Sequence, residues 1–421
     1  MKYQNNKEFA KQLDKEDPLV SYRKQFHFPI IKGNKQIYFC GNSLGLQPKG
    51  VKKAVNEELD AWAELGVEGH FKSKFDWFGY HHFLTAMSAR LVGAKNKEVV
   101  VMNNLTTNLH LMMVSFYRPT KTRFKILMEA NPFPSDRYAL ESQIKFHGFD
   151  PAKTLIELKP KEGKHNLCTD DIISTIEEHK DSLALVMMGG VNYYTGQAFE
   201  MDKITEAAHN IGALAGFDLA HAAGNLHLQL NKWKVDFAVW CTYKYLNSGP
   251  GGTSGVYINE KHVADKTLPR FAGWWGNNEK TRFLMQKEFD PTPTAEGWQL
   301  SNAQILPMAV HRTSLEMFDK AGIKNLRKKS VLLTGYLEYL LNDLAIEDIS
   351  ILTPKHPDHR GCQLSIVAKA RGKKLHAYLQ KHHIISDWRE PDVIRVAPVP
   401  LYNSFIDVWE LADRIRKFYM G

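Results

Sequence analysis

The chain has 421 residues, is 43% hydrophobic, and carries a formal net charge of +9. This length and apolar fraction allow a large core, so we expect one large domain and a smaller one. The basic residues are spread along the chain rather than clustered, which argues against a nucleic-acid-binding module. The four cysteines lie far apart with no CxxC pair, which argues against a disulfide framework and against a structural zinc site.

The first residues, MKYQNNKEFAKQLDKED, are charged and polar, unlike a secretory signal. No uninterrupted apolar run approaches the ~20 residues that a membrane span needs. We therefore expect a cytoplasmic protein without a membrane partner.

The N-terminal half begins with a helical arm over residues 1–40, which leads into a short strand, Gln36–Cys40. The turn-rich string GNSLGLQP follows at 41–48, and apolar residues at helical spacing predict a helix over 51–65. From about 85 to 260, short apolar strands alternate with helices. The predicted strands are Glu98–Met102, Lys125–Glu129, Leu183–Gly189, Ala213–Asp218, Phe237–Cys241 and Gly255–Ile258, and the helices between them include Ser135–His147, Thr169–Lys180 and Met201–Ile211. This alternation predicts an α/β fold, with helices on both faces of a mostly parallel sheet.

The pattern changes from about residue 310. One long helix over about 303–342 precedes a mixture of short strands and helices that predicts a smaller α+β domain. Its expected elements are Ser350–Leu352, Gln363–Ala368, a helix near 373–382, Val393–Val396 and a terminal helix. We expect an N-terminal arm over 1–50 that packs with the small domain, a large domain over 51–305, and a small domain over 306–421.

Two charged residues end neighbouring predicted strands. Lys244 follows the apolar strand Phe237–Cys241, and Asp218 ends the strand Ala213–Asp218, with His221 three residues later. Parallel sheets bind ligands at these strand ends. An acid here can keep a pyridine nitrogen protonated, and a lysine opposite it can carry pyridoxal phosphate (PLP). A helix cap is the alternative role for Asp218.

Polar turns after two other strands suit the remaining parts of such a cofactor. The string Met102–Thr107 ends a strand and begins a helix, which provides N–H groups and hydroxyls for a phosphate. The string Asn131–Asp136 follows the next strand, where Phe133 can stack on a ring and Asp136 can polarise it. Ordinary helix capping explains either string equally well when each is taken alone.

Taken together, these strings resemble the kynureninase family, fold-type-I PLP enzymes of the aspartate aminotransferase superfamily. The resemblance runs nearly from end to end and rests on the order and spacing of the motifs. They are GNSLGLQP (41–48), MNNLTTNLH (102–110), FPSD (133–136), YYTGQ (193–197), GFDLAHAAGN (216–225), WCTYKYLNSGPGG (240–252), GWWG (273–276), LSN (300–302) and RVAPVPLYNSF (395–405).

The resemblance implies a role for each matching residue. Lys244 is expected to be the Schiff-base lysine and proton carrier, Asp218 the partner of the pyridine nitrogen, and Tyr243 a phosphate ligand and proton shuttle. The other expected cofactor-binding residues are Leu105, Thr106, Phe133, Pro134, Ser135, Asp136 and His221, together with Trp274 and Asn302 from the second subunit of a homodimer. Arg395 is expected to clamp the substrate α-carboxylate, with His70, Ser43 and Ser301 near the aryl end of the substrate.

The implied reaction is hydrolytic Cβ–Cγ cleavage of L-kynurenine or 3-hydroxy-L-kynurenine to anthranilate or 3-hydroxyanthranilate and L-alanine. The preferred substrate, and a role in tryptophan degradation or in the route toward NAD, stay open. One alternative is a cysteine desulfurase or selenocysteine lyase, for which Cys362 is the only candidate nucleophile. Others are an aminotransferase and a non-catalytic PLP-binding regulator, although too few residues precede the first motif for a DNA-binding domain. We expect the His81–His82 and His382–His383 pairs to be solvated and predict no metal site.

Overall fold

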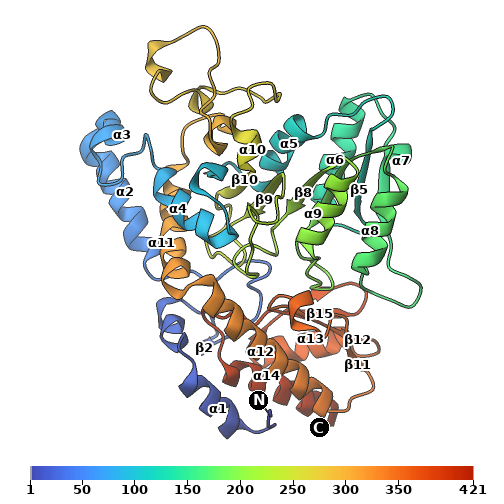
Figure 1. Ribbon diagram of the computed structural model, residues 1–421. Coiled ribbons are helices and arrows are strands. Elements are labelled where there is room, and N and C mark those ends of the chain that lie inside the picture. Colours follow the sequence, from blue (N-terminus) through green and yellow to red (C-terminus); the bar gives the residue numbers. More distant parts are fainter. Residues whose placement is uncertain (1, 421) are drawn as a thin grey trace.

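The computed structural model describes residues 2–420 and has a central seven-stranded sheet in the order β4-β10-β9-β8-β7-β5-β6 (Figure 1). Strand β10 runs antiparallel to both of its neighbours, and every other neighbouring pair in this sheet is parallel. The prediction of a mostly parallel α/β sheet is therefore confirmed. The strands are β4 (Val99–Met102), β5 (Lys125–Glu129), β6 (Leu155–Leu158), β7 (Leu183–Gly189), β8 (Leu214–Asp218), β9 (Phe237–Cys241) and β10 (Ser254–Ile258).

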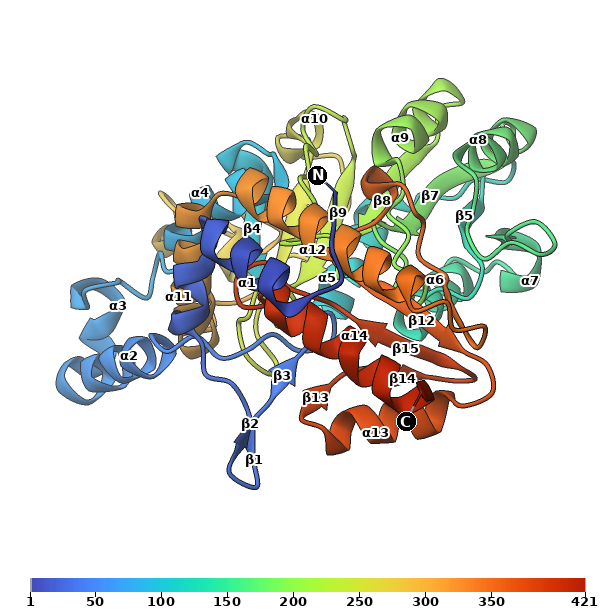
Figure 2. The same cartoon turned by 90° about the horizontal axis from the view of Figure 1, so that it is seen from below.

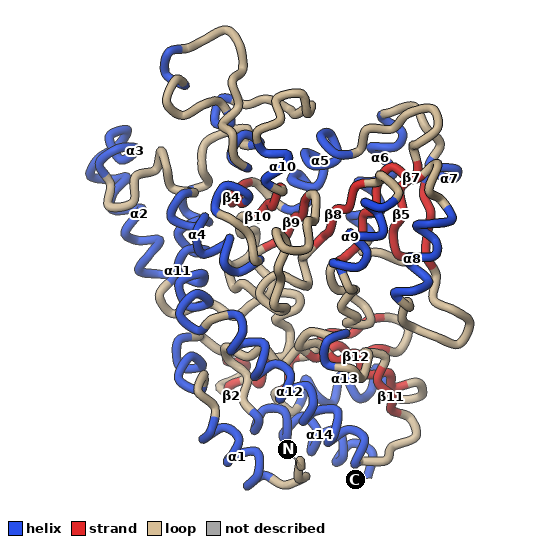
Figure 3. The backbone as a smooth tube through the Cα atoms, in the orientation of Figure 1, coloured by secondary structure: helices blue, strands red, loops and turns tan. Residues whose placement is uncertain are grey.

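Helices cover both faces of this sheet (Figure 3). Because side chains of a strand alternate between faces, Val100 and Met102 pack with one helical layer, while Val99 and Val101 pack with the other. The first layer contains α5 (Leu105–Phe116) and α6 (Pro134–Phe146). The second contains α4 (His82–Val92), α8 (Thr169–Glu178), α9 (Met201–Asn210) and α11 (Ile305–Ala321). The remaining helices of this part are α2 (Val51–Leu65), α3 (Gly69–Lys72), α7 (Pro151–Thr154) and α10 (Glu260–Val263).

The C-terminal part has its own antiparallel sheet, in the order β11-β12-β15-β14. A separate hydrophobic core joins this sheet to helices from both ends of the chain, and Figure 2 shows α1, α12 and α14 side by side. The elements are α1 (Lys7–Glu16), α12 (Ile323–Asp343), β11 (Ile349–Ile351), β12 (Leu364–Ala368), α13 (Gly372–Lys381), β14 (Asp387–Arg389), β15 (Val393–Val396) and α14 (Phe405–Met420). Every helix within residues 2–420 is too short or too polar to cross a membrane.

The N-terminal arm also pairs with the C-terminal part. After the small hairpin of β1 (Ile30–Ile31) and β2 (Asn34–Lys35), strand β3 (Ile37–Tyr38) runs parallel to β13 (Ile384–Ile385). The Asn403 side chain donates a hydrogen bond to the carbonyl of Tyr38, 365 residues away in sequence. The two ends of the chain are thus held in one unit.

The prediction of one helix over about 303–342 is wrong. Gly322 has φ +75°, a left-handed conformation that only glycine adopts without strain, and it separates α11 from α12. Helix α11 packs against α2 and α4, whereas α12 packs against α14. We therefore propose that the boundary between the large and small domains lies near Gly322 rather than at residue 306.

Candidate active site

The carboxyl ends of the central strands surround one cavity. Loops that follow β4, β5, β7, β8 and β9 all contribute to its wall, as expected for a parallel sheet. The residues that line it are Leu105, Thr106, Glu129, Phe133, Ser135, Asp136, Gly189, Val191, Tyr193, Asp218, Ala220, His221, Tyr243 and Lys244. Thus most residues predicted to hold a cofactor lie together. Pro134 begins α6 beside this cavity.

Lys244 lies against a neutral histidine. Its Nζ atom is 3.1 Å from Nε2 of His221. Burial, together with the nearby Lys244 and Arg395 charges, lowers the pKa of His221 well below its usual value. The imidazole can therefore accept a hydrogen bond from the lysine. The same Nζ lies 5.6 Å from the centre of the Phe133 ring, so an aromatic wall flanks the lysine.

Three buried carboxyl groups share this cavity. Burial raises the pKa of Asp218 and, further, that of Asp136, and it raises the pKa of Glu129 to about 7. Oδ1 of Asp218 accepts a hydrogen bond from the Ala220 N–H at 2.6 Å, whereas Oδ1 of Asp136 has no partner among residues 2–420. Buried acids without enough cations favour a positively charged ligand. A protonated pyridine ring fits this requirement.

Another part of the cavity wall suits a phosphate. Helix α5 begins after Asn104, whose side chain accepts a hydrogen bond from the Thr107 N–H, and α6 begins at Pro134. The hydroxyls of Thr106 and Ser135 lie 2.8 Å apart, so the first turns of two helices meet here. Helix N-termini attract anions through free N–H groups and the helix dipole. The residues present therefore fit PLP at both its ring and its phosphate.

Arg395 is buried beside the cavity, with 1% of its surface exposed. One guanidinium nitrogen donates to the Tyr193 carbonyl at 2.6 Å, and another forms an ion pair with Asp387. The Tyr193 ring packs edge-on against Phe133, with 5.5 Å between the ring centres. A planar cation held this way suits a carboxylate of a substrate.

Besides Pro134 and Arg395, which lie beside this cavity, five other predicted residues do not line it. Trp274, in the short turn η4 (Trp274–Gly276), is 44% exposed, and Ser301 and Asn302 lie in an exposed loop. His70 packs against Trp77, and the backbone of Ser43 bonds to Cys40. Their proposed roles near the substrate or in a second subunit therefore stay predictions.

Sequence reasoning overlooked two residues of the cavity that have polar side chains, Glu129 and Tyr193. Glu129 ends strand β5 in the same way that Asp218 ends β8. Its position at a strand end could have identified it as a residue of the cavity. Tyr193 belongs to the YYTGQ string, to which no role was given. The interpretation of both residues of the His81–His82 pair as solvated is also wrong, because His81 is only 2% exposed.

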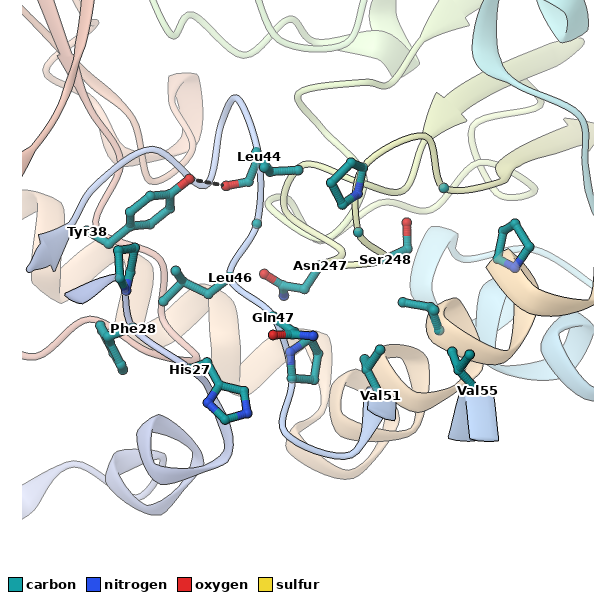
Figure 4. Close-up of a pocket in the computed structure, with 18 of the residues that line it drawn as sticks. His27, Phe28, Tyr38, Leu44, Leu46, Gln47, Val51, Val55, Asn247 and Ser248 are labelled. Carbon is teal, nitrogen blue, oxygen red and sulfur yellow. Dashed lines mark hydrogen bonds between the residues drawn. The ribbon is translucent and has the colours of Figure 1, made fainter. Parts of the chain in front are cut away.

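A larger cavity of about 740 Å³ is lined in part by the loop after Lys244, including Asn247 and Ser248 (Figure 4). Its wall comes from the N-terminal arm, the start of α2, residues 247–250 and 252, and the start of α11, and it includes apolar side chains such as Phe28, Leu46 and Val51. The Tyr38 hydroxyl closes one end by donating to the Leu44 carbonyl at 2.7 Å. Its lining contains no carboxylate and no lysine, so the reactive groups are those of the Lys244 cavity.

Comparison with known proteins gives close relatives over the full length. The chain is 51% identical over 420 residues to the kynureninase of Christiangramia forsetii, covering 99% of both chains. It is 54% identical over 414 residues to that of Myxococcus xanthus, covering 98% of this chain and 97% of the relative. Residues 326–415 match the model of the kynureninase C-terminal domain.

Solved structures resemble the fold at much lower identity. A cysteine desulfurase from Thermococcus onnurineus superposes with a TM-score of 0.77 at 20% identity, covering 95% of this chain and 98% of the other. The cysteine desulfurase CsdA from Escherichia coli gives 0.76 at 15% identity, covering 96% and 98%. These structures support the fold-type-I architecture, and the sequence relatives identify the family. The chain belongs to the kynureninase family.

Proposed function

We propose that this protein is a kynureninase, a PLP-dependent hydrolase that splits the Cβ–Cγ bond of L-kynurenine or 3-hydroxy-L-kynurenine. The products are L-alanine and anthranilate or 3-hydroxyanthranilate. The observation that carries the proposal is the joint presence of Lys244, Asp218 and Arg395 around one cavity in a chain about half identical to kynureninases over its whole length. Bound PLP withdraws electrons from the substrate amino acid and so weakens the bonds near its α-carbon.

Different residues of the cavity would bind different parts of the cofactor. Lys244 would carry PLP, and Asp218, backed by Asp136, would pair with the ring nitrogen. Thr106 and Ser135 would donate hydroxyl hydrogens to the phosphate at the two helix N-termini. Phe133 would cover one ring face.

Lys244 and its neighbour Tyr243 would transfer the protons. Nζ of Lys244 would remove the proton from the substrate α-carbon and later return it, while neutral His221 orients this nitrogen. Burial raises the pKa of Tyr243, so its side chain stays a phenol at neutral pH. A phenol can donate a proton to the substrate γ-carbonyl oxygen and take one back from the water adduct.

Arg395 would bind the α-carboxylate of the substrate. Its guanidinium is already oriented by Asp387 and by the Tyr193 carbonyl, so little conformational freedom is lost when a substrate arrives. The aryl end would then extend toward His70, Ser43 and Ser301.

We also propose a homodimer in which Trp274 and Asn302 of one subunit complete the site of the other. A segment that protrudes from the large domain in Figure 1 supports this, since large apolar side chains on it are exposed. They are Phe271, Trp274, Phe283, Leu284 and Met285, with exposed fractions from 44% to 74%. Apolar patches of this kind mark protein interfaces. A cytoplasmic location stays a prediction from the sequence.

The cysteine desulfurase alternative requires a reactive thiol on an accessible loop. Cys362 is 1% exposed, its N–H is bonded to the Asn225 side chain, and burial raises the pKa of its thiol to about 12. A buried, protonated thiol is a poor nucleophile, so the kynureninase function is favoured.

A single assay tests the proposal. Purified protein with PLP is mixed with L-kynurenine or its 3-hydroxy form, and the aromatic product is followed by fluorescence and alanine by chromatography. Equimolar products establish the hydrolase. A protein that binds PLP, forms neither product and releases sulfur from cysteine would contradict it.

A further inference from the structure

Two histidines and one glutamate meet at the start of α4, outside the Lys244 cavity. His81 directly precedes α4, His82 is its first residue, and Glu296 lies in the short turn η6 (Ala295–Trp298). Oε2 of Glu296 is 3.6 Å from Nε2 of His81 and 3.4 Å from Nε2 of His82. One ligand atom from each of the three residues falls within 4.8 Å of the other two.

One long hydrogen bond, between His82 and Glu296, does not account for the whole cluster. A separation of 3.6 Å is too long for a hydrogen bond, and 3.4 Å lies beyond the usual range. His81 is 2% exposed, and neither of its ring nitrogens has a partner among residues 2–420. Leaving a buried polar group unpaired is costly, so natural proteins rarely do it. The Nε2 atom of His81 faces Glu296, which indicates a shared ligand between them.

The spacing between each histidine and the carboxylate matches that of ligands around a tetrahedral metal ion. Metal–ligand distances of about 2.1 Å place the atoms at neighbouring tetrahedral corners about 3.4 Å apart. The two observed histidine–carboxylate separations are 3.4 and 3.6 Å, and the third pair of ligand atoms lies within 4.8 Å. Imidazole and carboxylate ligands together suit zinc and related divalent first-row metals.

We propose that His81, His82 and Glu296 form a binding site for a divalent transition metal, with zinc as the best fit. Glu279 lies at the edge of this cluster, with its Oε2 3.9 Å from Nε2 of His82, but it is not one of the three residues whose ligand atoms lie within 4.8 Å of one another. The two carboxylates balance the charge of a divalent ion. The three residues supply three protein ligands, and a water molecule would complete a tetrahedral set.

The role of this site is to join two parts of the chain. His81 and His82 belong to the start of α4, whereas Glu279 and Glu296 flank much of the protruding apolar segment that holds Phe283, Leu284 and Met285. A bound ion would fix this segment to the large domain. The effect is on stability rather than on the chemistry at Lys244, because none of the four residues lines that cavity.

The test uses the full chain with PLP bound and without a polyhistidine tag. The protein is treated with a chelator, desalted and titrated with zinc chloride, and retained zinc is measured by mass spectrometry. Thermal unfolding is recorded with and without zinc. We expect one zinc per chain and a higher Tm. His82→Asn and Glu296→Gln should each weaken zinc binding at least about tenfold and remove the gain in Tm, because even the loss of an outer-shell partner costs about that much.

His356→Ala is the matched control. His356 is an exposed histidine beside a second histidine, His359, and a carboxylate, Asp358, and its loss should leave zinc binding unchanged. If His82→Asn does not fold, as judged by circular dichroism, the zinc affinity of the Glu296→Gln variant tests the proposal. A wild-type protein that retains no zinc, or variants that bind zinc as the wild type does, would show that the cluster is an ion pair only.

Discussion

Nζ of Lys244 lies 3.1 Å from Nε2 of His221, a lysine facing a histidine whose pKa is lowered by burial. Two cations would repel each other here, but a neutral imidazole accepts a hydrogen bond from the lysine and orients it. Lys244 therefore has a defined position at the end of β9, close to the carboxylate of Asp218 at the end of β8.

The first prediction concerns this lysine. Lys244→Ala should abolish the visible absorbance of the bound cofactor and lower turnover at least about 10²-fold, since it removes the proton carrier. The measurement is the fluorescence of the aromatic product, with circular dichroism as the test of folding. Lys232→Ala, an exposed lysine of the same region, is the control and should keep full activity. Turnover near wild type in the Lys244 variant would contradict the assignment.

A second prediction separates two arginines that contact the same aspartate. Arg395 and Arg389 both pair with Asp387, but Arg395 is buried and Arg389 is partly exposed. Arg395→Ala should lower kcat/KM at least about 30-fold, or about 2 kcal/mol, because a substrate carboxylate loses its partner in a buried site. Arg389→Ala should change it less than about fivefold. If both substitutions lower kcat/KM equally, the loss comes from breaking the ion pairs of Asp387 and not from a lost contact with the substrate.

The third prediction is a pH dependence from Glu129. Its pKa is raised to about 7, so the folded state binds its proton more tightly than the unfolded state does. Stability must then fall as the pH rises from about 4.5 to about 7, and the full loss is about 3 kcal/mol. In cofactor-free protein, Glu129→Gln should therefore raise Tm at pH 8 and leave it nearly unchanged at pH 4. A constant difference across this range would show that Glu129 does not titrate there.

The fourth prediction tests how the arm supports the lysine. The N–H of Gly45 donates to the Tyr243 carbonyl at 2.8 Å, and a Cβ at position 45 would overlap the carbonyl oxygen of Lys244. Gly45→Ala should cost about 1–3 kcal/mol in stability and slow turnover, because the backbone at Lys244 must shift. Gly50→Ala is the control, since its added Cβ meets only a methyl group of Thr313, at 3.0 Å. Chemical denaturation and the product assay measure both effects.

The sequence predicted the central sheet well because its strands are short apolar runs with clear ends. Strands β5, β7 and β9 have the expected limits. Strand β6 was missed because its residues, LIEL, contain a charge and follow the one-turn helix α7 directly. The break at Gly322 was missed because the helical pattern of apolar residues continues across it, although the glycine was visible.

For the site, local sequence was informative wherever a polar residue ends a buried strand. Lys244 and Asp218 follow this rule, and Glu129 also does, but only the fold brings it close to Asp136 and Asp218. The position of Arg395 against Tyr193 depends on how the two domains pack, which no local pattern encodes. Trp274 and Asn302 are proposed to contact the site of a second subunit. The sequence of one chain does not show where that subunit lies.

The pairing of β3 with β13 has a consequence for how the protein is made. Ribosomes release the N-terminus first, so the arm that supports Lys244 must wait for residues 384–385 before its own strand has a partner. Arg395 emerges later still. Until residues 384–395 leave the ribosome, the nascent chain has the Lys244 loop but neither the strand that pairs with the arm nor the arginine beside the cavity. Cofactor capture that yields a competent enzyme is therefore a post-translational event.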